Sequence, residues 1–192
     1  METTPQKKPA GELCRYSPLH VLMLDNGLRR FFQDPRKILS GYIRPGMTVI
    51  DIGCGTGTFT LPVAEMVGEK GTVIAADVQR EMLEHARKKS ERSGLGSRLL
   101  WHNNSPDNLG VDRPVDFALS FNMVHEVQDP EQLFREVFQI LRPGGKYFVI
   151  EPVFHVSERA FRQTLAIATS AGFRIQERPA VSLSRAALLG KA

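Results

Sequence analysis

The stretch VIDIGCGTG, residues 49–57, decides the fold of this 192-residue chain. A short apolar run ends at Asp51 and Ile52 and leads at once into three glycines, at positions 53, 55 and 57, before a helical pattern begins. Glycines accept positive φ angles and let backbone amides approach a ligand closely. In an open α/β sheet, ligands bind beyond the carboxyl ends of the strands. The stretch therefore predicts a ligand-binding loop between a buried strand and a helix.

Strand and helix patterns alternate on both sides of this loop. From the apolar periodicity we expect strands at residues 49–52, 72–76, 98–102, 115–121, 146–150, 173–178 and 182–189, and helices at 59–67, 79–93, 130–141 and 157–171. Pro143, Gly144 and Gly145 predict a turn without a ligand role. Only three residues separate the last two strands, which suits an antiparallel pair and leaves no room for a crossover helix. The fold class is thus α/β, with a doubly wound, mostly parallel seven-stranded sheet and an antiparallel last strand.

The amino-terminal quarter differs from the rest of the chain. Residues 1–17 are polar and predict a flexible arm. In residues 18–45 apolar side chains recur every three or four positions, and Asp34 with Pro35 restarts a helix. We expect this segment to form a helical lid. With Tyr16 at the end of the arm, its available side chains include His20, Phe31 and Phe32, and core packing is the alternative role of the two phenylalanines. Residues 46–192 would form the ligand-binding domain.

Composition limits the classes of function. Residues 1–45 carry eight basic and four acidic side chains, whereas the remaining residues carry 17 of each sign. Such a basic segment suits an anionic surface or an ordinary solvated helix; the lack of interleaved aromatic residues favours the helix and argues against a nucleic-acid partner. No apolar run reaches the ~20 residues of a membrane span. The start lacks the apolar centre of a signal peptide, so we expect a cytoplasmic protein. Cys14 and Cys54 form no CxxC pair, so we expect no metal.

Two kinds of cofactor compete for the glycine loop. A dinucleotide loop with the pattern GxGxxG would place its third glycine at position 58, but this chain has Thr58 there and Gly57 one residue earlier. Asp51 would repel a pyrophosphate and attract a cationic amino-acid group. Asp77, at the end of the second strand, can accept hydrogen bonds from ribose hydroxyls. A ligand with a ribose and an ammonium group but without a phosphate is S-adenosylmethionine.

Four sequence blocks carry a family resemblance at this point. They are VIDIGCGTG, VIAADVQREML, DFALSFNMVHEV and LRPGGKYFVIEP, and they occur in order between residues 49 and 152. With them the chain resembles class I S-adenosylmethionine-dependent methyltransferases of the Rossmann-like fold, in particular the type 11 group similar to quinone-biosynthesis C-methyltransferases. The resemblance implies that the chain binds S-adenosylmethionine and releases S-adenosylhomocysteine.

The resemblance also implies roles for individual residues. Around the methionine part of the cofactor it places Asp51, Gly53, Cys54 and Gly55, and it makes Gly57 necessary for the turn. Asp77 would hold the ribose and Val78 would pack on the adenine. Many relatives have an aspartate after the third strand where this chain reads HNNSPDN, so Asn104 and Ser105 are the candidates for the adenine edge. Asn122 would lie below the sulfonium. For Cys54, a small side chain that fits a crowded loop is the alternative to any chemical role.

The sequence gives fewer signals for the methyl acceptor than for the cofactor. Methyl transfer from a sulfonium is an in-line displacement that needs a general base only when the acceptor must lose a proton. His125, after the fourth strand, is the candidate base; its alternative is a structural role at the next helix. Glu151 and His155, separated by Pro152 and Phe154, suggest a wall of the cleft. We expect transfer to a small-molecule acceptor, with two alternatives: a noncatalytic cofactor-binding subunit that supports a partner, or a methyltransferase of RNA or protein. The oligomeric state stays open.

Overall fold

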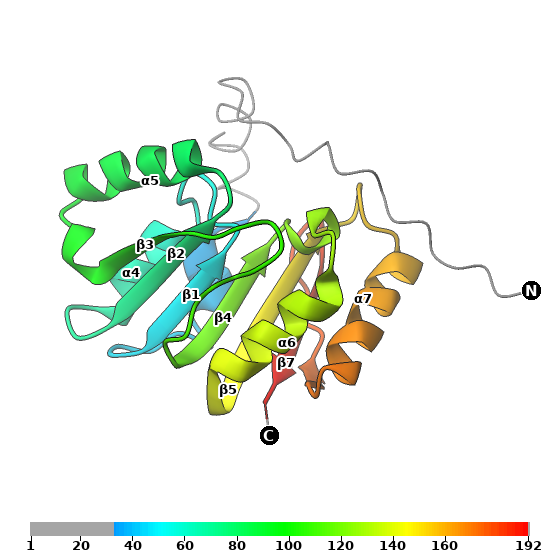
Figure 1. The fold of residues 1–192 in the computed structure, drawn as a ribbon. Coiled ribbons are helices and arrows are strands. Elements are labelled where there is room, and N and C mark those ends of the chain that lie inside the picture. The colour runs from blue at the N-terminus through cyan, green and yellow to red at the C-terminus, as the bar shows by residue number, and fades with distance from the viewer. Residues whose placement is uncertain (1–32, 192) are drawn as a thin grey trace, which may run out of the picture.

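A computed structural model describes residues 33–191, and its centre is a seven-stranded sheet (Figure 1). The strands are β1 (Thr48–Ile52), β2 (Thr72–Asp77), β3 (Leu99–Asn103), β4 (Val115–Phe121), β5 (Leu141–Pro152), β6 (Arg174–Glu177) and β7 (Ser184–Gly190). Their order is β3-β2-β1-β4-β5-β7-β6. β1 to β5 pair in parallel, and β7 runs antiparallel to both of its neighbours. The predicted sheet, including its antiparallel last strand, is confirmed.

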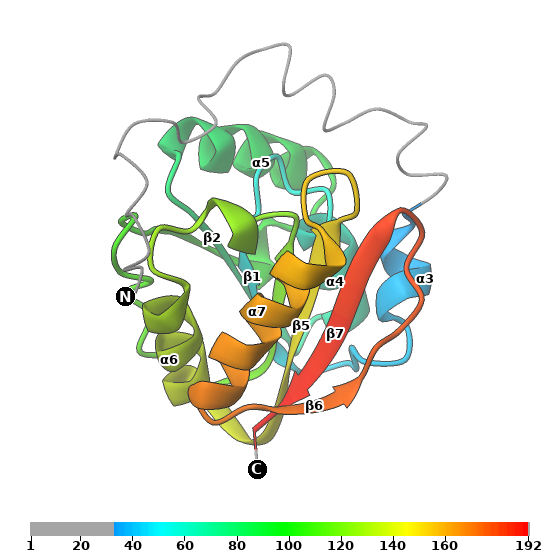
Figure 2. The same cartoon turned by 90° about the vertical axis from the view of Figure 1, so that its right-hand side faces the viewer.

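Helices cover both faces of this sheet (Figures 1 and 2). One face packs against α3 (Pro35–Leu39), α4 (Thr60–Val67) and α5 (Arg80–Arg92), and the other against α6 (Pro130–Ile140) and α7 (Glu158–Ser170). Successive side chains of a strand point to opposite faces. Val49 accordingly joins the cluster with α4, whereas Ile50 joins the cluster with α6 and α7. Burial on both faces explains why the central strands read as continuous apolar runs.

Side-chain caps fix where several helices begin. Asp34 accepts a hydrogen bond from the Arg36 amide at 3.0 Å, and Pro35 opens α3 as predicted. The Ser157 hydroxyl accepts one from the Ala160 amide at 3.1 Å at the start of α7. Each cap satisfies a backbone N–H that has no partner within its helix.

The turn predicted at Pro143–Gly145 is wrong, because β5 already begins at Leu141. Val115 pairs with Leu141 and Phe117 with Lys146, so the residues between them bulge from the ladder. The amide of Gly144 donates to the carbonyl of Lys191, and the amide of Lys191 donates to the carbonyl of Gly145, at 3.1 and 2.9 Å. These bonds with the residue after β7 turn the expected loop into an extension of the strand.

The amino-terminal part of the chain is described only from Gln33 onward. The predicted arm (residues 1–17) and most of the predicted lid, with His20, Phe31 and Phe32, lie outside the described residues. Gln33 itself is buried, and its amide donates to the Ser182 carbonyl and to the Ser184 hydroxyl, both at 2.9 Å. Within residues 33–191, no helix has the length and apolar character to cross a membrane.

Candidate active site

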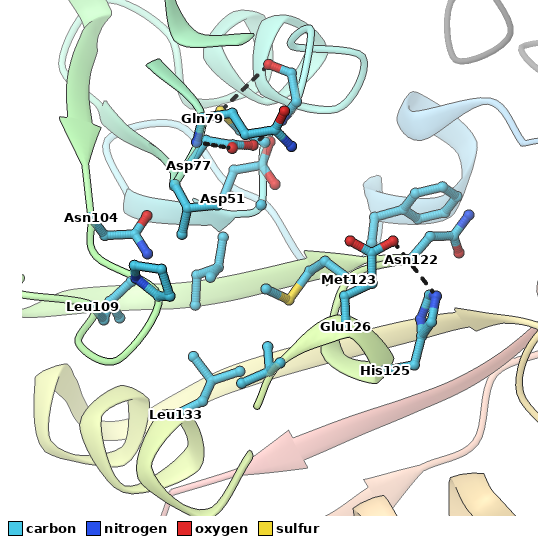
Figure 3. A pocket seen from close by; sticks show the side chains of 18 of the residues that line it. Asp51, Asp77, Gln79, Asn104, Leu109, Asn122, Met123, His125, Glu126 and Leu133 are labelled. Atoms are coloured by element: carbon cyan, nitrogen blue, oxygen red, sulfur yellow. Dashed lines mark hydrogen bonds and ion pairs between the residues drawn. The ribbon is translucent and has the colours of Figure 1, made fainter. Parts of the chain in front are cut away.

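A cavity of about 520 Å³ lies at the carboxyl ends of the central strands (Figure 3). Its walls come from the ends of β1, β2 and β4 and from the segments that follow β3 and β5. The chain crosses from β1 to β2 in one direction along the sheet and reaches β4 in the other. A crevice between β1 and β4 is therefore the topological switch point at which open α/β sheets bind ligands.

The glycine loop is shaped by packing at its two ends and is open in its middle. Gly53 and Gly57 have φ angles of 70° and 81°. An added Cβ would lie 2.8 Å from Met123 Cγ at the first position and 3.2 Å from Ala86 Cβ at the second. At Gly55, with a φ of 52°, a Cβ would meet nothing within 4 Å. The loop backbone around Gly55 is thus accessible to a ligand.

Asp77, at the end of β2, organises the loops that surround the cavity. It is almost fully buried, and its two carboxylate oxygens accept hydrogen bonds from the amides of Gly55 and Gln79, both at 2.8 Å. Burial raises the pKa of Asp77, although these amides work against the rise. Behind it, the Asn103 side chain donates to the carbonyl oxygens of Asp77 and Val78. Asp77 therefore holds the protein's own backbone in addition to lining the cavity.

Asp51 is a buried carboxyl group that borders the same cavity. Only 2% of it is exposed, and the Thr60 hydroxyl donates to its Oδ2 at 2.6 Å. Burial raises the pKa of Asp51 to about 7; the Thr60 hydrogen bond opposes the rise and the nearby Asp77 adds to it. A cationic group in the cavity would favour the ionised form. Asp51 is thus suited to a positively charged ligand.

Three buried side-chain oxygens among the described residues lack a hydrogen-bond partner. They belong to Thr56, Asn104 and Asn122, and all three residues line the cavity. Asn122 also adopts a φ of 56°, which is uncommon for a residue other than glycine. A buried acceptor without a donor costs free energy. This set fits a ligand that brings its own hydroxyl, amino or amide donors into the cavity.

Most of the other cofactor candidates from the sequence meet here too. Val78 and Ser105 line the cavity, and the Ser105 hydroxyl donates to the Asn108 carbonyl at 3.3 Å. Cys54 lines it as well, but its side chain is buried with Ala75 and Leu83, and burial raises the pKa of its thiol. Gly57 does not line the cavity and instead makes the turn against α5.

His125 borders the cavity in a short 3₁₀ turn after β4 (Figure 3). Its Nδ1 forms a hydrogen bond with Oε2 of Glu151, a residue of β5 that is only 1% exposed. Glu151 Oε1 accepts the Val124 amide at 2.8 Å. On the other side of the ring, Nε2 lies 3.8 Å from Oε1 of Glu126. Burial raises the pKa of the Glu126 carboxyl group.

The sequence indicated Glu151 and His125 at the cleft but did not predict the hydrogen bond between them. The two residues are 26 positions apart, and only the pairing of β4 with β5 brings them together. A carboxylate at the end of one parallel strand and a histidine just after its neighbour was the available signal.

Apart from two histidines, the ionisable side chains of the cavity lining are acidic. Its lining includes the carboxyl groups of Asp51, Asp77, Asp107, Glu126, Asp129 and Glu136, and no Lys or Arg from the described part of the chain. Residues 33–191 hold no cluster of three or more His, Cys, Asp or Glu side chains arranged for a metal ion. The electrostatic field of this lining favours cations over anions.

Comparisons with known proteins agree with this geometry. A family model described as a methyltransferase domain matches residues 49–145. The ubiquinone/menaquinone biosynthesis C-methyltransferase UbiE of Vibrio vulnificus (strain YJ016) is 34% identical over 148 residues, which are 73% of this chain and 55% of that protein. The UbiE of Vibrio cholerae (strain N16961) is 32% identical over 72% of this chain and 53% of its own length. This chain thus spans about half the length of the curated relatives it matches.

Solved structures show the same fold. The structure of a SAM-dependent methyltransferase from Aquifex aeolicus superposes with a TM-score of 0.82 at 26% identity and covers 93% of this chain and 100% of its own. An O-methyltransferase from Thermotoga maritima has a TM-score of 0.67 at 20% identity and covers 83% of this chain and 64% of its own; it shows the fold alone.

Proposed function

Since this chain belongs to the class I S-adenosylmethionine-dependent methyltransferase family, we propose that it binds S-adenosylmethionine in the cavity and transfers the methyl group to a small-molecule acceptor. The observation that carries the proposal is the set of unpartnered buried oxygens beside two buried carboxyl groups. A nucleoside with an amino-acid tail and a sulfonium charge supplies the donors and the positive charge that this set lacks.

In the proposal, the glycine loop and two strand-end carboxyl groups hold the methionine part and the ribose. Asp51, Gly53, Cys54 and Gly55 surround the methionine part, and Gly57 keeps the loop turned. Asp77 accepts hydrogen bonds from the ribose hydroxyls. It uses the carboxylate lone pairs that are not occupied by its two bonds to backbone amides.

The adenine and the sulfonium lie on opposite sides of the ribose. Val78 packs on the adenine, Asn104 and Ser105 contact its edge, and Asn122 lies below the sulfonium. The unpartnered oxygens of Asn104 and Asn122 support the last two roles.

The cofactor would supply a methyl group bound to a cationic sulfur. After the transfer this sulfur is the neutral thioether of S-adenosylhomocysteine. The tasks of the protein are then to align the acceptor with that methyl group and to exclude water. The cavity volume is within the ~300–1,000 Å³ of small-molecule sites. Apolar walls from Phe59, Phe121 and Met123 suit an acceptor with an apolar body. The buried free thiol of Cys54 is compatible with a reducing cytoplasm, where we place the protein.

Calorimetry with purified protein tests the cofactor. We expect S-adenosylmethionine and S-adenosylhomocysteine to bind and NAD to give no heat, because the lining offers carboxylates where a pyrophosphate would need donors. Tight NAD binding without a response to S-adenosylmethionine would overturn the proposal.

Mass spectrometry tests the transfer itself. Incubating the protein with methyl-labelled S-adenosylmethionine and the small-molecule fraction of a cell extract should produce a labelled metabolite. A protein that binds the cofactor and labels nothing in this fraction would instead be a cofactor-binding subunit or act on a macromolecule.

A further inference from the structure

We infer that Glu151 holds His125 as the base of the reaction, so that the acceptor is a group that loses a proton when it is methylated. The inference rests on the proposed function and adds to it a positioning residue and the chemical class of the acceptor: a hydroxyl, an amine or an acidic C–H group, in place of a thioether or another nucleophile without a proton.

The hydrogen bonds of Glu151 determine how the proton is placed on the imidazole. Its Oε1 receives the Val124 amide, and its Oε2 faces Nδ1 of His125. An ionised carboxylate only accepts hydrogen bonds. Nδ1 therefore carries the hydrogen of the neutral ring, and Nε2 keeps the lone pair that takes up a proton.

The second nitrogen faces another residue of the cavity lining. Nε2 points towards Glu126, and both residues line the cavity (Figure 3). About a quarter of the His125 side chain is exposed, against almost none of Glu151. Glu151 thus orients the ring from within the protein, while the opposite nitrogen remains close to where an acceptor would lie.

Three ionisable side chains surround the ring. Glu126 faces it from the same 3₁₀ turn, Glu151 from β5 and His155 from the segment after β5, with 6.0 Å between the two imidazole centroids. A carboxylate beside the ring stabilises the imidazolium that forms when Nε2 takes up a proton.

The proton balance is simple. The X–H bond of the acceptor breaks, its proton moves to Nε2 of His125, and its electron pair forms the bond to the methyl carbon. The pair of the carbon–sulfur bond stays on sulfur, which becomes neutral. The imidazolium then releases its proton to water, and no further reactant is needed.

The Glu151→Gln variant separates positioning from folding. Glutamine keeps the size of the side chain, and its oxygen can still accept the Val124 amide. Its NH₂ group then donates to Nδ1, which forces the hydrogen of the neutral ring onto Nε2 and removes the base. Glu131→Gln, an exposed residue of α6 outside the cavity lining, is the matched control.

The first readout needs neither cofactor nor acceptor. In ¹⁵N NMR spectra of histidine-labelled protein, with the signals assigned by a His125→Gln sample, neutral His125 should carry its hydrogen on Nδ1 in the wild type and in Glu131→Gln. In Glu151→Gln it should carry it on Nε2. A wild-type ring with the hydrogen on Nε2, or a tautomer that does not change in Glu151→Gln, would overturn the inference.

The second readout is methyl transfer from labelled S-adenosylmethionine to the small-molecule fraction of a cell extract. A base contributes about 10²–10⁴-fold, so His125→Ala should lose that much and Glu151→Gln at least about tenfold, with cofactor affinity unchanged. Full activity of Glu151→Gln would overturn the inference even where the enzyme proposal holds. Failure of the wild type to bind the cofactor or to label any acceptor would count against the proposed function, and the tautomer would still decide the positioning.

Discussion

The side-chain amide of Asn103 donates a hydrogen bond to the backbone carbonyl of Asp77 at 2.9 Å and so joins the carboxyl ends of β3 and β2. A second bond, of 3.1 Å, reaches the Val78 carbonyl from the same nitrogen. The backbone that carries the proposed ribose and adenine contacts is thus held by a residue that is not among the cavity-lining residues.

Asn103→Ala should therefore weaken S-adenosylmethionine binding without deleting a cofactor contact. Each of the two lost hydrogen bonds contributes about 0.5–1.5 kcal/mol, and a loss equal to one of them corresponds to a Kd about 2- to 10-fold higher by calorimetry. Ser93→Ala removes an exposed side-chain bond to the Lys89 carbonyl and is the control. Equal affinities of both variants and the wild type would show that the position of Asp77 does not depend on Asn103.

Asp77→Ala should reduce both cofactor affinity and stability. Hydrogen bonds to a charged group contribute about 1.5–3 kcal/mol, which corresponds to a Kd roughly 10- to 150-fold higher. Because the amides of Gly55 and Gln79 lose their acceptor, the ligand-free variant should also unfold at a lower temperature. Unchanged affinity would place the ribose elsewhere, and an unchanged Tm would show that water replaces the carboxylate.

The raised pKa of Asp51 predicts how the stability of the ligand-free protein depends on pH. The group has a pKa of about 7 in the folded protein against 3.8 in the reference state, so between these values the folded protein binds more protons than the unfolded chain. Its contribution to the free energy of unfolding must then fall as the pH rises from about 4 to about 7. Urea titrations across this range should show a smaller decline for Asp51→Asn; an identical decline would contradict the role of Asp51.

The same group should make cofactor binding depend on pH with the opposite trend. A cationic ligand favours ionised Asp51, so the affinity for S-adenosylmethionine should rise with pH up to about 7 and then level off. The Asp51→Asn variant should bind more weakly and show a flatter profile. Calorimetry at several pH values measures both, and a profile that is as steep in the variant would assign the dependence to another group.

Gly53→Ala and Gly55→Ala form a matched pair in the loop. Both residues have positive φ, which costs an alanine roughly 1–2 kcal/mol. Only at position 53 would the new methyl group also collide with Met123. Gly53→Ala should thus lower the Tm by more than Gly55→Ala, as differential scanning fluorimetry can show. Equal losses at the two positions would mean that Met123 moves to accommodate the methyl group at 53.

The fold was predictable because its strands and helices have clear local patterns. The mostly apolar run at β1, the glycines after it and the cap at Ser157 are each signals that span only a few residues. The error at Pro143–Gly145 has a different origin. Proline and two glycines are typical of a turn, but their backbone groups pair with Lys191, and a partner so distant in sequence leaves no local signal.

The sequence brought most of the candidate residues to the cavity but did not give their contacts. The glycine loop and the strand-end acids point to the cavity because carboxyl ends of parallel strands meet there. Which neighbour each side chain binds depends on strand order and loop geometry. For that reason the sequence indicated Asn104 and Ser105 and left out Asn103, and it placed His125 and Glu151 at the same cleft without pairing them.

The acidic lining of the cavity should bind the cofactor before and after methyl transfer with different affinity, because the transfer removes the positive charge of the sulfonium. In the proposed reaction, methyl transfer removes the positive charge of the sulfonium from the surroundings of Asp51 and Asp77. The attraction that favoured the incoming cofactor is then weaker for the spent one, and the pKa of Asp51 shifts back towards its value in the ligand-free protein. Turnover should therefore be accompanied by proton uptake at this end of the sheet. Product release would be driven in part by the loss of charge compensation.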